Sequence, residues 1–215
     1  RFDGVRSEHI EAQEGDPARS LQITALLTAR NGDLWVGYDY GGVAVYRHGR
    51  LQGRNEGTPR GSVVAIAQSS DGAIWVASES SNSQRLRYYK SGKWRVFTSG
   101  VDLPDEHTQD MIADRDGAIV IALSDSIHRF DPASGRFVRL NARGGDSVGL
   151  GKDRSGNVWI IDNDSLRRLD GWGGTMRLTP GTTGYIGRRL LFDRDGRLWV
   201  TGQDRGIIRL LPETL

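Results

Sequence analysis

The sequence contains no cysteine among its 215 residues, which excludes thiol catalysis, cysteine-ligated zinc and disulfide bonds. It also lacks any run of 18 apolar residues, and it does not open on a basic segment followed by an apolar one. We therefore expect neither a membrane-spanning helix nor a signal peptide within it. Proline is scarce at 6 residues, whereas glycine reaches 29. This balance suits many short strands joined by tight turns.

An excess of charge of one sign is also missing, because 29 basic residues face 27 acidic ones. A nucleic-acid-binding protein would gather its basic side chains on one face, whereas the arginines here are spread along the chain. We predict no nucleic-acid partner and no membrane contact by this segment. Since the four histidines show no paired spacing, we also predict no metal site and no cofactor. They are His9, His48, His107 and His128.

A six-residue pattern, in which a turn leads into a strand, occurs five times. Asp, Asn or Ser precedes Gly, and an aliphatic-Trp-aliphatic triplet ends most copies. The glycine recurs at intervals of 40, 45, 39 and 40 residues, which indicates a repeat architecture. The copies are Asn31–Val36, Asp71–Val76, Asp116–Ile121, Ser155–Ile160 and Asp195–Val200.

The segments around each copy predict the rest of the repeat. One apolar run precedes the turn, a third strand-like run follows the Trp strand, and a fourth run is visible in three repeats. Four short antiparallel strands in about 40 residues are typical of a β-propeller blade. We predict an all-β fold, a single propeller domain over residues 1–215 with five repeats. The predicted blades are residues 20–56, 60–100, 107–142, 146–180 and 186–215.

The two ends of the chain have complementary deficits. Residues 1–12 contain a predicted fourth strand without blade partners, and the last repeat lacks a clear fourth strand. We expect the N-terminal strand to join the last blade and close the ring, since closure removes exposed strand edges. The alternative is that the five repeats are an excerpt of a larger propeller.

Two repeated positions carry structural expectations. Val120 stands where the other four copies have Trp, so we expect less aromatic packing between that sheet and its neighbour. Arg129, Arg168 and Arg209 recur at one place in the third strand. Because a scaffold bond recurs in every repeat and a ligand touches one place, we interpret these arginines as bridges to a turn acid.

The written-out repeat resembles a known family. Asp114–Gly117, Asp193–Val200 and the closing Arg-apolar-Asp triplets are similar to the two-component regulator propeller repeat, over residues 21–211. That family forms the extracytoplasmic sensor region of bacterial hybrid histidine kinases and diguanylate cyclases. The resemblance implies a non-catalytic, ligand- or partner-binding sensor in the periplasmic or extracellular portion of a membrane-anchored regulator. It also implies a possible homodimer, with any output domain outside this sequence.

A second resemblance leaves an enzyme as the alternative. Gly196–Thr201 and Ile207–Leu210 are similar to virginiamycin B lyase, a propeller enzyme with a metal-assisted His and Glu site. We find no counterpart of that constellation, so we assign no catalytic residue. A propeller lyase or hydrolase, or a pure protein-interaction scaffold, remains open beside the sensor.

Candidate ligand-binding residues lie in two places. In the innermost strand, Asp110 and Arg189 stand where other repeats have small residues, and they either pair or contact a ligand. The loops between second and third strands carry acids that would ring the channel mouth, where they would attract a cation or bind sugar hydroxyls. Tyr38 and Tyr40 would offer stacking surfaces, and the ligand would be a small molecule, an oligosaccharide or a protein. The alternative is that Asp simply favours turns. The acids are Asp39, Glu79, Asp125, Asp162, Asp164 and Asp204.

Overall fold

The computed structural model describes nine stretches of the chain: residues 5–6, 22–54, 61–79, 86–143, 148–162, 166–170, 175–178, 187–202 and 206–210. These stretches form five antiparallel sheets, which we number as blades 1 to 5 in chain order. Four blades have four strands each, and the fifth has three described strands. No helix in the described part of the chain is long and apolar enough to cross a membrane.

Within each blade the strands pair in sequence order, as successive hairpins. Blade 1 contains β1 (Ile23–Thr28), β2 (Leu34–Tyr38), β3 (Gly42–Arg47) and β4 (Arg50–Gly53). Blade 2 contains β5 (Ser62–Gln68), β6 (Ile74–Glu79), β7 (Leu86–Lys90) and β8 (Lys93–Phe97). Blade 3 contains β9 (Thr108–Ala113), β10 (Ile119–Leu123), β11 (Ser126–Asp131) and β12 (Arg136–Arg143). Blade 4 contains β13 (Gly149–Lys152), β14 (Val158–Ile161), β15 (Leu166–Asp170) and β16 (Thr175–Leu178). Blade 5 contains β17 (Gly187–Phe192), β18 (Leu198–Gly202) and β19 (Gly206–Leu210).

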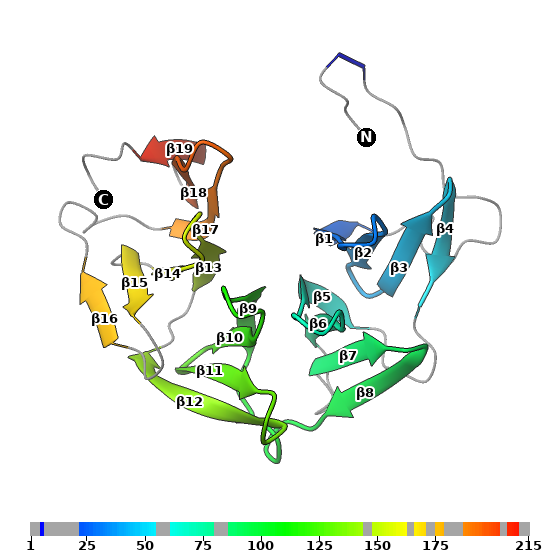
Figure 1. Ribbon diagram of the computed structural model, residues 1–215, viewed down its shortest axis with the longest axis horizontal. Helices are drawn as coiled ribbons and strands as arrows, with labels where there is room; N and C mark the ends of the chain where they lie inside the picture. Colours follow the sequence, from blue (N-terminus) through cyan, green and yellow to red (C-terminus); the bar gives the residue numbers. More distant parts are fainter. Residues whose placement is uncertain are drawn as a thin grey trace.

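The blades follow one another around a common centre, as a propeller requires (Figure 1). The first strand of each blade is innermost, and contacts run from β1 to β5, β9, β13 and β17 in turn. In Figure 1 blades 1 and 5 stand on either side of an opening. The predicted closing strand, residues 1–12, lies outside the described residues except for Val5 and Arg6, which are not in a strand. Closure of the ring therefore stays a prediction.

The repeated turn has the same hydrogen bonds in all five blades. In blade 3 the N–H of Gly117 donates to the carbonyl of Asp114 at 3.0 Å, and the N–H of Asp114 donates to the carbonyl of Ala118 at 2.9 Å. The glycine needs a left-handed backbone, with φ of 75° at Gly117, a conformation that a side chain disfavours. The turn thus explains why glycine marks every repeat. The five glycines are Gly32, Gly72, Gly117, Gly156 and Gly196.

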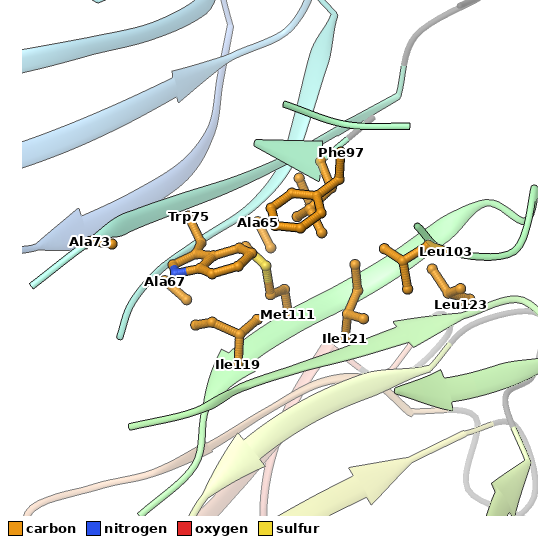
Figure 2. Packing of buried hydrophobic residues seen from close by; sticks show 12 residues of the cluster. Ala65, Ala67, Ala73, Trp75, Phe97, Leu103, Met111, Ile119, Ile121 and Leu123 are labelled. Atoms are coloured by element: carbon orange, nitrogen blue, oxygen red, sulfur yellow. The ribbon is translucent and has the colours of Figure 1, made fainter. Parts of the chain in front are cut away.

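The core consists of a series of apolar layers between neighbouring blades. Between blades 2 and 3, Trp75 of β6 lies against Met111 and Ile119 of blade 3 (Figure 2). Its indole stacks on Phe97 with ring centroids 5.3 Å apart and approaches Phe130 of blade 3 at 4.8 Å. Because each blade buries its second strand against the next blade, the apolar faces leave water only when the blades stack.

The second-strand tryptophan also connects each layer to a turn. The indole Nε1 of Trp75 donates to Ser69 Oγ at 3.1 Å. Trp159 and Trp199 donate at 2.9 and 2.8 Å to the aspartate that begins their own turn. Val120 has no such group, and the layer that it joins between blades 3 and 4 is built mainly of aliphatic residues. The expected loss of aromatic packing at Val120 is thus confirmed.

Candidate functional site

The innermost strands place five equivalent residues in the same register. Asp110 pairs with Ala122 across β9 and β10, and Arg189 pairs with Thr201 across β17 and β18. The other members are small, and they are Ala25, Ala65 and Gly149. In four blades a register irregularity accompanies this position, so the inner strand departs from regular pairing there. The spacing in the sequence therefore predicted the structural equivalence correctly.

Asp110 and Arg189 form an ion pair between blades that are not neighbours. Arg189 Nη1 lies 2.8 Å from Asp110 Oδ1, although blade 4 separates their blades in the sequence. Arg189 Nη2 also reaches the carbonyl oxygen of Val64 on β5 at 3.5 Å. One side chain of blade 5 thus contacts blades 3 and 2. Of the two expectations for this pair, mutual pairing is observed, and contact with a ligand stays a prediction.

The Asp110 carboxylate is held by a complete set of donors. Its side chain is only 8% exposed, whereas that of Arg189 is 50% exposed. The backbone N–H groups of Met111 and Leu150 donate to it at 2.8 and 2.9 Å. Burial raises the pKa of Asp110, although Arg189 and both N–H groups oppose that rise. The guanidinium of Arg189 therefore helps to keep the buried Asp110 carboxylate ionised.

The acids of the second-to-third loops do not share one environment. Asp39 accepts a hydrogen bond from Ser62 of the next blade, and Asp162 forms an ion pair with Arg167 of its own blade. Glu79 and Asp125 are exposed. Asp164 and Asp204 lie outside the described residues. An acidic ring that binds a ligand at the channel mouth thus stays a prediction, with two of its acids already engaged by protein groups.

The two candidate tyrosines differ sharply in exposure. Tyr38 is 3% exposed and packs with Val36 and Ala44, so the expectation that it offers a stacking surface is wrong. The alternation of side chains along β2 turns its ring into the blade, which the loop-based prediction did not consider. Tyr40 is 73% exposed and has a left-handed backbone with φ of 57°. Its ring is available to a ligand.

Sequence reasoning missed a buried arginine in blade 2. Arg87 is fully buried between blades 1 and 2, with its guanidinium 5.2 Å from the centre of the Trp94 ring. Its Nη1 donates to Ser78 Oγ at 3.1 Å, while Nε and Nη2 find no hydrogen-bond partner among the residues that the structure describes. Burial lowers the pKa of Arg87 to about 10. Within the described residues Arg87 has no carboxylate partner, and a buried cation without a counter-charge is costly.

Blade 4 shows what is missing around Arg87. Arg87 pairs with Val76 across β6 and β7, as Arg167 pairs with Ile160 across β14 and β15. Two residues after these partners stand Ser78 in blade 2 and Asp162 in blade 4. Arg167 therefore has a carboxylate where Arg87 has a hydroxyl. Aligning the repeats at this position would have revealed the difference.

Of the three repeated third-strand arginines, Arg129 forms the predicted bridge to an acid of the turn. Arg129 Nε donates to Asp114 Oδ2 at 2.6 Å, and Nη2 lies 3.2 Å from Asp116 Oδ2. Blades 1 and 2 achieve the same bridge with the residue that ends the third strand, because Arg47 pairs with Asp33 and Lys90 with Asp71. Each of these pairs fastens a turn to the third strand of its own blade.

Metal-binding chemistry has no cluster to support it within the described ranges, where no three His, Asp or Glu side chains converge. His128 is buried, and its Nε2 lies 2.9 Å from Ser126 Oγ, which also bonds to Glu106. Burial lowers the pKa of His128, so the imidazole favours the neutral form. This histidine belongs to a local hydrogen-bond network.

Comparison with known proteins relates the fold to extracellular propellers. No family model matches the chain, and no curated protein does. All of this chain aligns with 29% of the extracellular domain of the putative one component system BT4673 from B. thetaiotaomicron, with a TM-score of 0.76 and 21% identity. In a second alignment, 95% of this chain matches 30% of the extracellular domain of the putative hybrid two component system BT3049 from the same organism, with a TM-score of 0.69 and 14% identity.

A lyase also has a similar fold, with a lower TM-score than the BT4673 domain. This chain aligns over 88% of its length with 70% of virginiamycin B lyase from Staphylococcus aureus, with a TM-score of 0.65 and 16% identity. The chain therefore spans less than a third of the two B. thetaiotaomicron chains and most of the lyase. At these identities the likeness shows the propeller fold, as the resemblance to two-component regulator propellers predicts.

The channel ion pair generates a pH-dependent prediction. Arg189→Met removes the guanidinium and leaves Asp110 buried without its counter-charge, so the free energy of unfolding at pH 7 should fall by about 2 kcal/mol. The loss should shrink as the pH falls through the raised pKa of Asp110, because a protonated carboxyl needs no partner. Urea denaturation at pH 7 and at about pH 5 measures both effects.

The control for this experiment is Asp110→Asn combined with Arg189→Met. That double variant has no carboxylate to titrate at this position, so its stability relative to the Asp110→Asn single variant should not change with pH. A loss in Arg189→Met that is the same at both pH values would contradict a charge-based role for the pair.

A second prediction follows from Arg87. Ser78→Asp places a carboxylate where blade 4 has Asp162, and it should raise the free energy of unfolding by about 1 kcal/mol or more. The reverse change, Asp162→Ser, should lower it by about 3 kcal/mol, since it leaves Arg167 without its partner. Chemical denaturation checks both. Ser78→Asn is the neutral control, and a Ser78→Asp protein no more stable than Ser78→Asn would refute the comparison.

Proposed function

We propose that this chain is a non-catalytic sensor propeller of a bacterial signalling regulator, which binds a ligand or a protein partner. The observation that carries the proposal is the alignment of the whole chain with an extracellular domain of a signalling protein, at a TM-score of 0.76. The same likeness favours a location outside the cytoplasm, in the periplasmic or extracellular portion of a membrane-anchored protein.

The described residues support a rigid platform. The Arg189 side chain joins blade 5 to blades 3 and 2, so it restrains three blades at once. A ligand that contacts several blades, or a partner that spans them, would shift how two protomers pair and so bias an output domain. Among the described candidate residues, Arg189 is half-exposed, and Tyr40, Glu79 and Asp125 are exposed, so these four groups remain accessible.

The arc of blades also bears on the size of the propeller. Figure 1 shows an opening between blades 1 and 5, and we propose that it is filled either by a closing strand from residues 1–12 or by further blades. The chains of BT4673 and BT3049 are more than three times as long as the part that aligns here. This length favours the proposal that the five repeats belong to a larger propeller.

The third prediction tests the ligand-binding sensor against the pure protein-interaction scaffold. A thermal-shift screen of oligosaccharides and divalent ions should identify a compound that raises the Tm in a concentration-dependent manner. Arg189→Met should weaken that shift if the compound binds at the channel. A screen without any stabilising compound, together with a propeller that captures one defined protein partner, would favour the scaffold.

The lyase alternative has its own readout. The protein is incubated with quinupristin, the compound bound in one of the lyase structures, and a divalent metal, and the products are examined by mass spectrometry. We expect unchanged compound. Turnover that persists in Arg189→Met but is lost with a chelator would overturn the non-catalytic proposal.

A further inference from the structure

A cavity of about 140 Å³ opens between blades 3 and 4, beside the turn that begins at Asp114. Val120 and Leu140 of blade 3 and Val158 and Leu169 of blade 4 form its apolar lining. Asp114 and Arg129 give it a charged side, and the exposed Arg115 and Asp116 lie at its rim. None of these residues belongs to the channel described above.

The cavity occupies the place where another blade interface holds an indole. Val120 corresponds in the repeat to Trp75, and both side chains belong to the layer that faces the following blade. Leu140 corresponds to Phe97, and Leu169 corresponds to Phe130. Both of these rings contact Trp75 in the interface between blades 2 and 3. The interface between blades 3 and 4 therefore lacks three aromatic rings at one point.

The polar side of the cavity retains the group that an indole uses. In blades 4 and 5 the Oδ2 atom of the first turn aspartate accepts the indole N–H, from Trp159 to Asp153 and from Trp199 to Asp193. Asp114 is the equivalent aspartate, and its Oδ1 accepts the turn N–H groups as theirs do. Its Oδ2 accepts from Arg129 Nε at 2.6 Å instead. A carboxylate oxygen has a second acceptor position, which a ligand N–H can use.

The chemistry of the lining selects one class of ligand. A cavity of about 150 Å³ with aliphatic walls holds a benzene-sized ring. The guanidinium of Arg129, 7% exposed, adds a cation that favours an aromatic face. A carboxylate at one end favours a donor over an acceptor. These three properties match a planar aromatic ring that carries an N–H group.

We propose that the cavity between blades 3 and 4 is a binding site for a small indole-like ligand, with Asp114 as the acceptor of its N–H. The apolar part of the ligand packs on Val120, Leu140 and Leu169, and the guanidinium of Arg129 lies against the ring. The site is independent of the sensor assignment, because it is built from the repeat itself.

The fourth prediction uses indole as the probe and the isotope-labelled protein. Indole should shift the amide NMR signals of Val120 and Leu169 with a Kd of about 0.1–1 mM. Benzofuran, which has an oxygen in place of the N–H, should bind about tenfold more weakly. Equal binding of the two compounds would refute the role of Asp114.

Substitution of the wall then tests the position of the site. Val120→Trp restores the indole that the other blades carry, so it should abolish the indole-induced shifts and raise the Tm without ligand. Val101→Trp is the matched control, because Val101 is an exposed loop residue and its substitution should leave binding unchanged. Shifts that persist in Val120→Trp, or an absence of shifts in the wild type, would overturn the proposal.

A second variant guards against misfolding of Val120→Trp. Leu140→Phe introduces the residue that blade 2 has at this position, Phe97, so the repeat accommodates it elsewhere. The larger ring narrows the cavity, and we expect at least a tenfold loss of indole affinity. Unchanged affinity in Leu140→Phe would count against the site in the same way.

Discussion

The contact on which the structure depends is the packing of one second-strand side chain of blades 1 to 4 against the next blade. The second strands of blades 1, 2, 4 and 5 carry a tryptophan at this position, and in blades 2, 4 and 5 its indole N–H bonds to the residue that begins the turn of its own blade. One residue thus fixes both the layer between blades and the turn that enters the strand. Because each blade is a small sheet with two apolar faces, it is stable only when its neighbours cover them.

This contact explains why the fold was readable from the sequence. Gly117 and its equivalents need a left-handed backbone, and tryptophan is rare enough that its recurrence marks a period. The period predicts which segments are strands and the order in which they pair. It also predicts that Asp110 and Arg189 occupy equivalent positions in their blades. Ring closure was not settled in the same way, because it depends on residues 1–12, which lie outside the repeat.

Side-chain environment was harder to predict than the fold. Tyr38 and Tyr40 lie two residues apart, but Tyr38 ends β2 and is buried, whereas Tyr40 lies in the turn beyond β2, has a left-handed backbone and is exposed. Arg87 was missed because its strand reads as a polar and aromatic run. That Arg87 bonds to a hydroxyl where Arg167 pairs with a carboxylate is recognised only when Ser78 is compared with Asp162 in the folded blades. Exceptions to the repeat were therefore more informative about sites than the repeat itself.

The channel pair, the buried Arg87 and the cavity at Val120 share one origin. A propeller repeats its scaffold bonds in every blade, so a single blade is free to depart from them while the others maintain the fold. Asp110 and Arg189 stand where the other blades have small residues, Arg87 has Ser78 where Arg167 has Asp162, and Val120 stands where the other blades have tryptophan. We propose that any binding function of this propeller lies at such local departures.

Native-state hydrogen exchange, resolved by strand, is the most direct measurement of whether the second-strand side chain governs how blades are held together. We predict that the boundary between blades 3 and 4 opens at the lowest free energy, about 2 kcal/mol below that between blades 2 and 3, because Val120 contributes far less packing than Trp75. Amides of β10 and β14 would then exchange before those of β6. Opening of the Trp75 boundary at an equal or lower free energy would contradict that central claim.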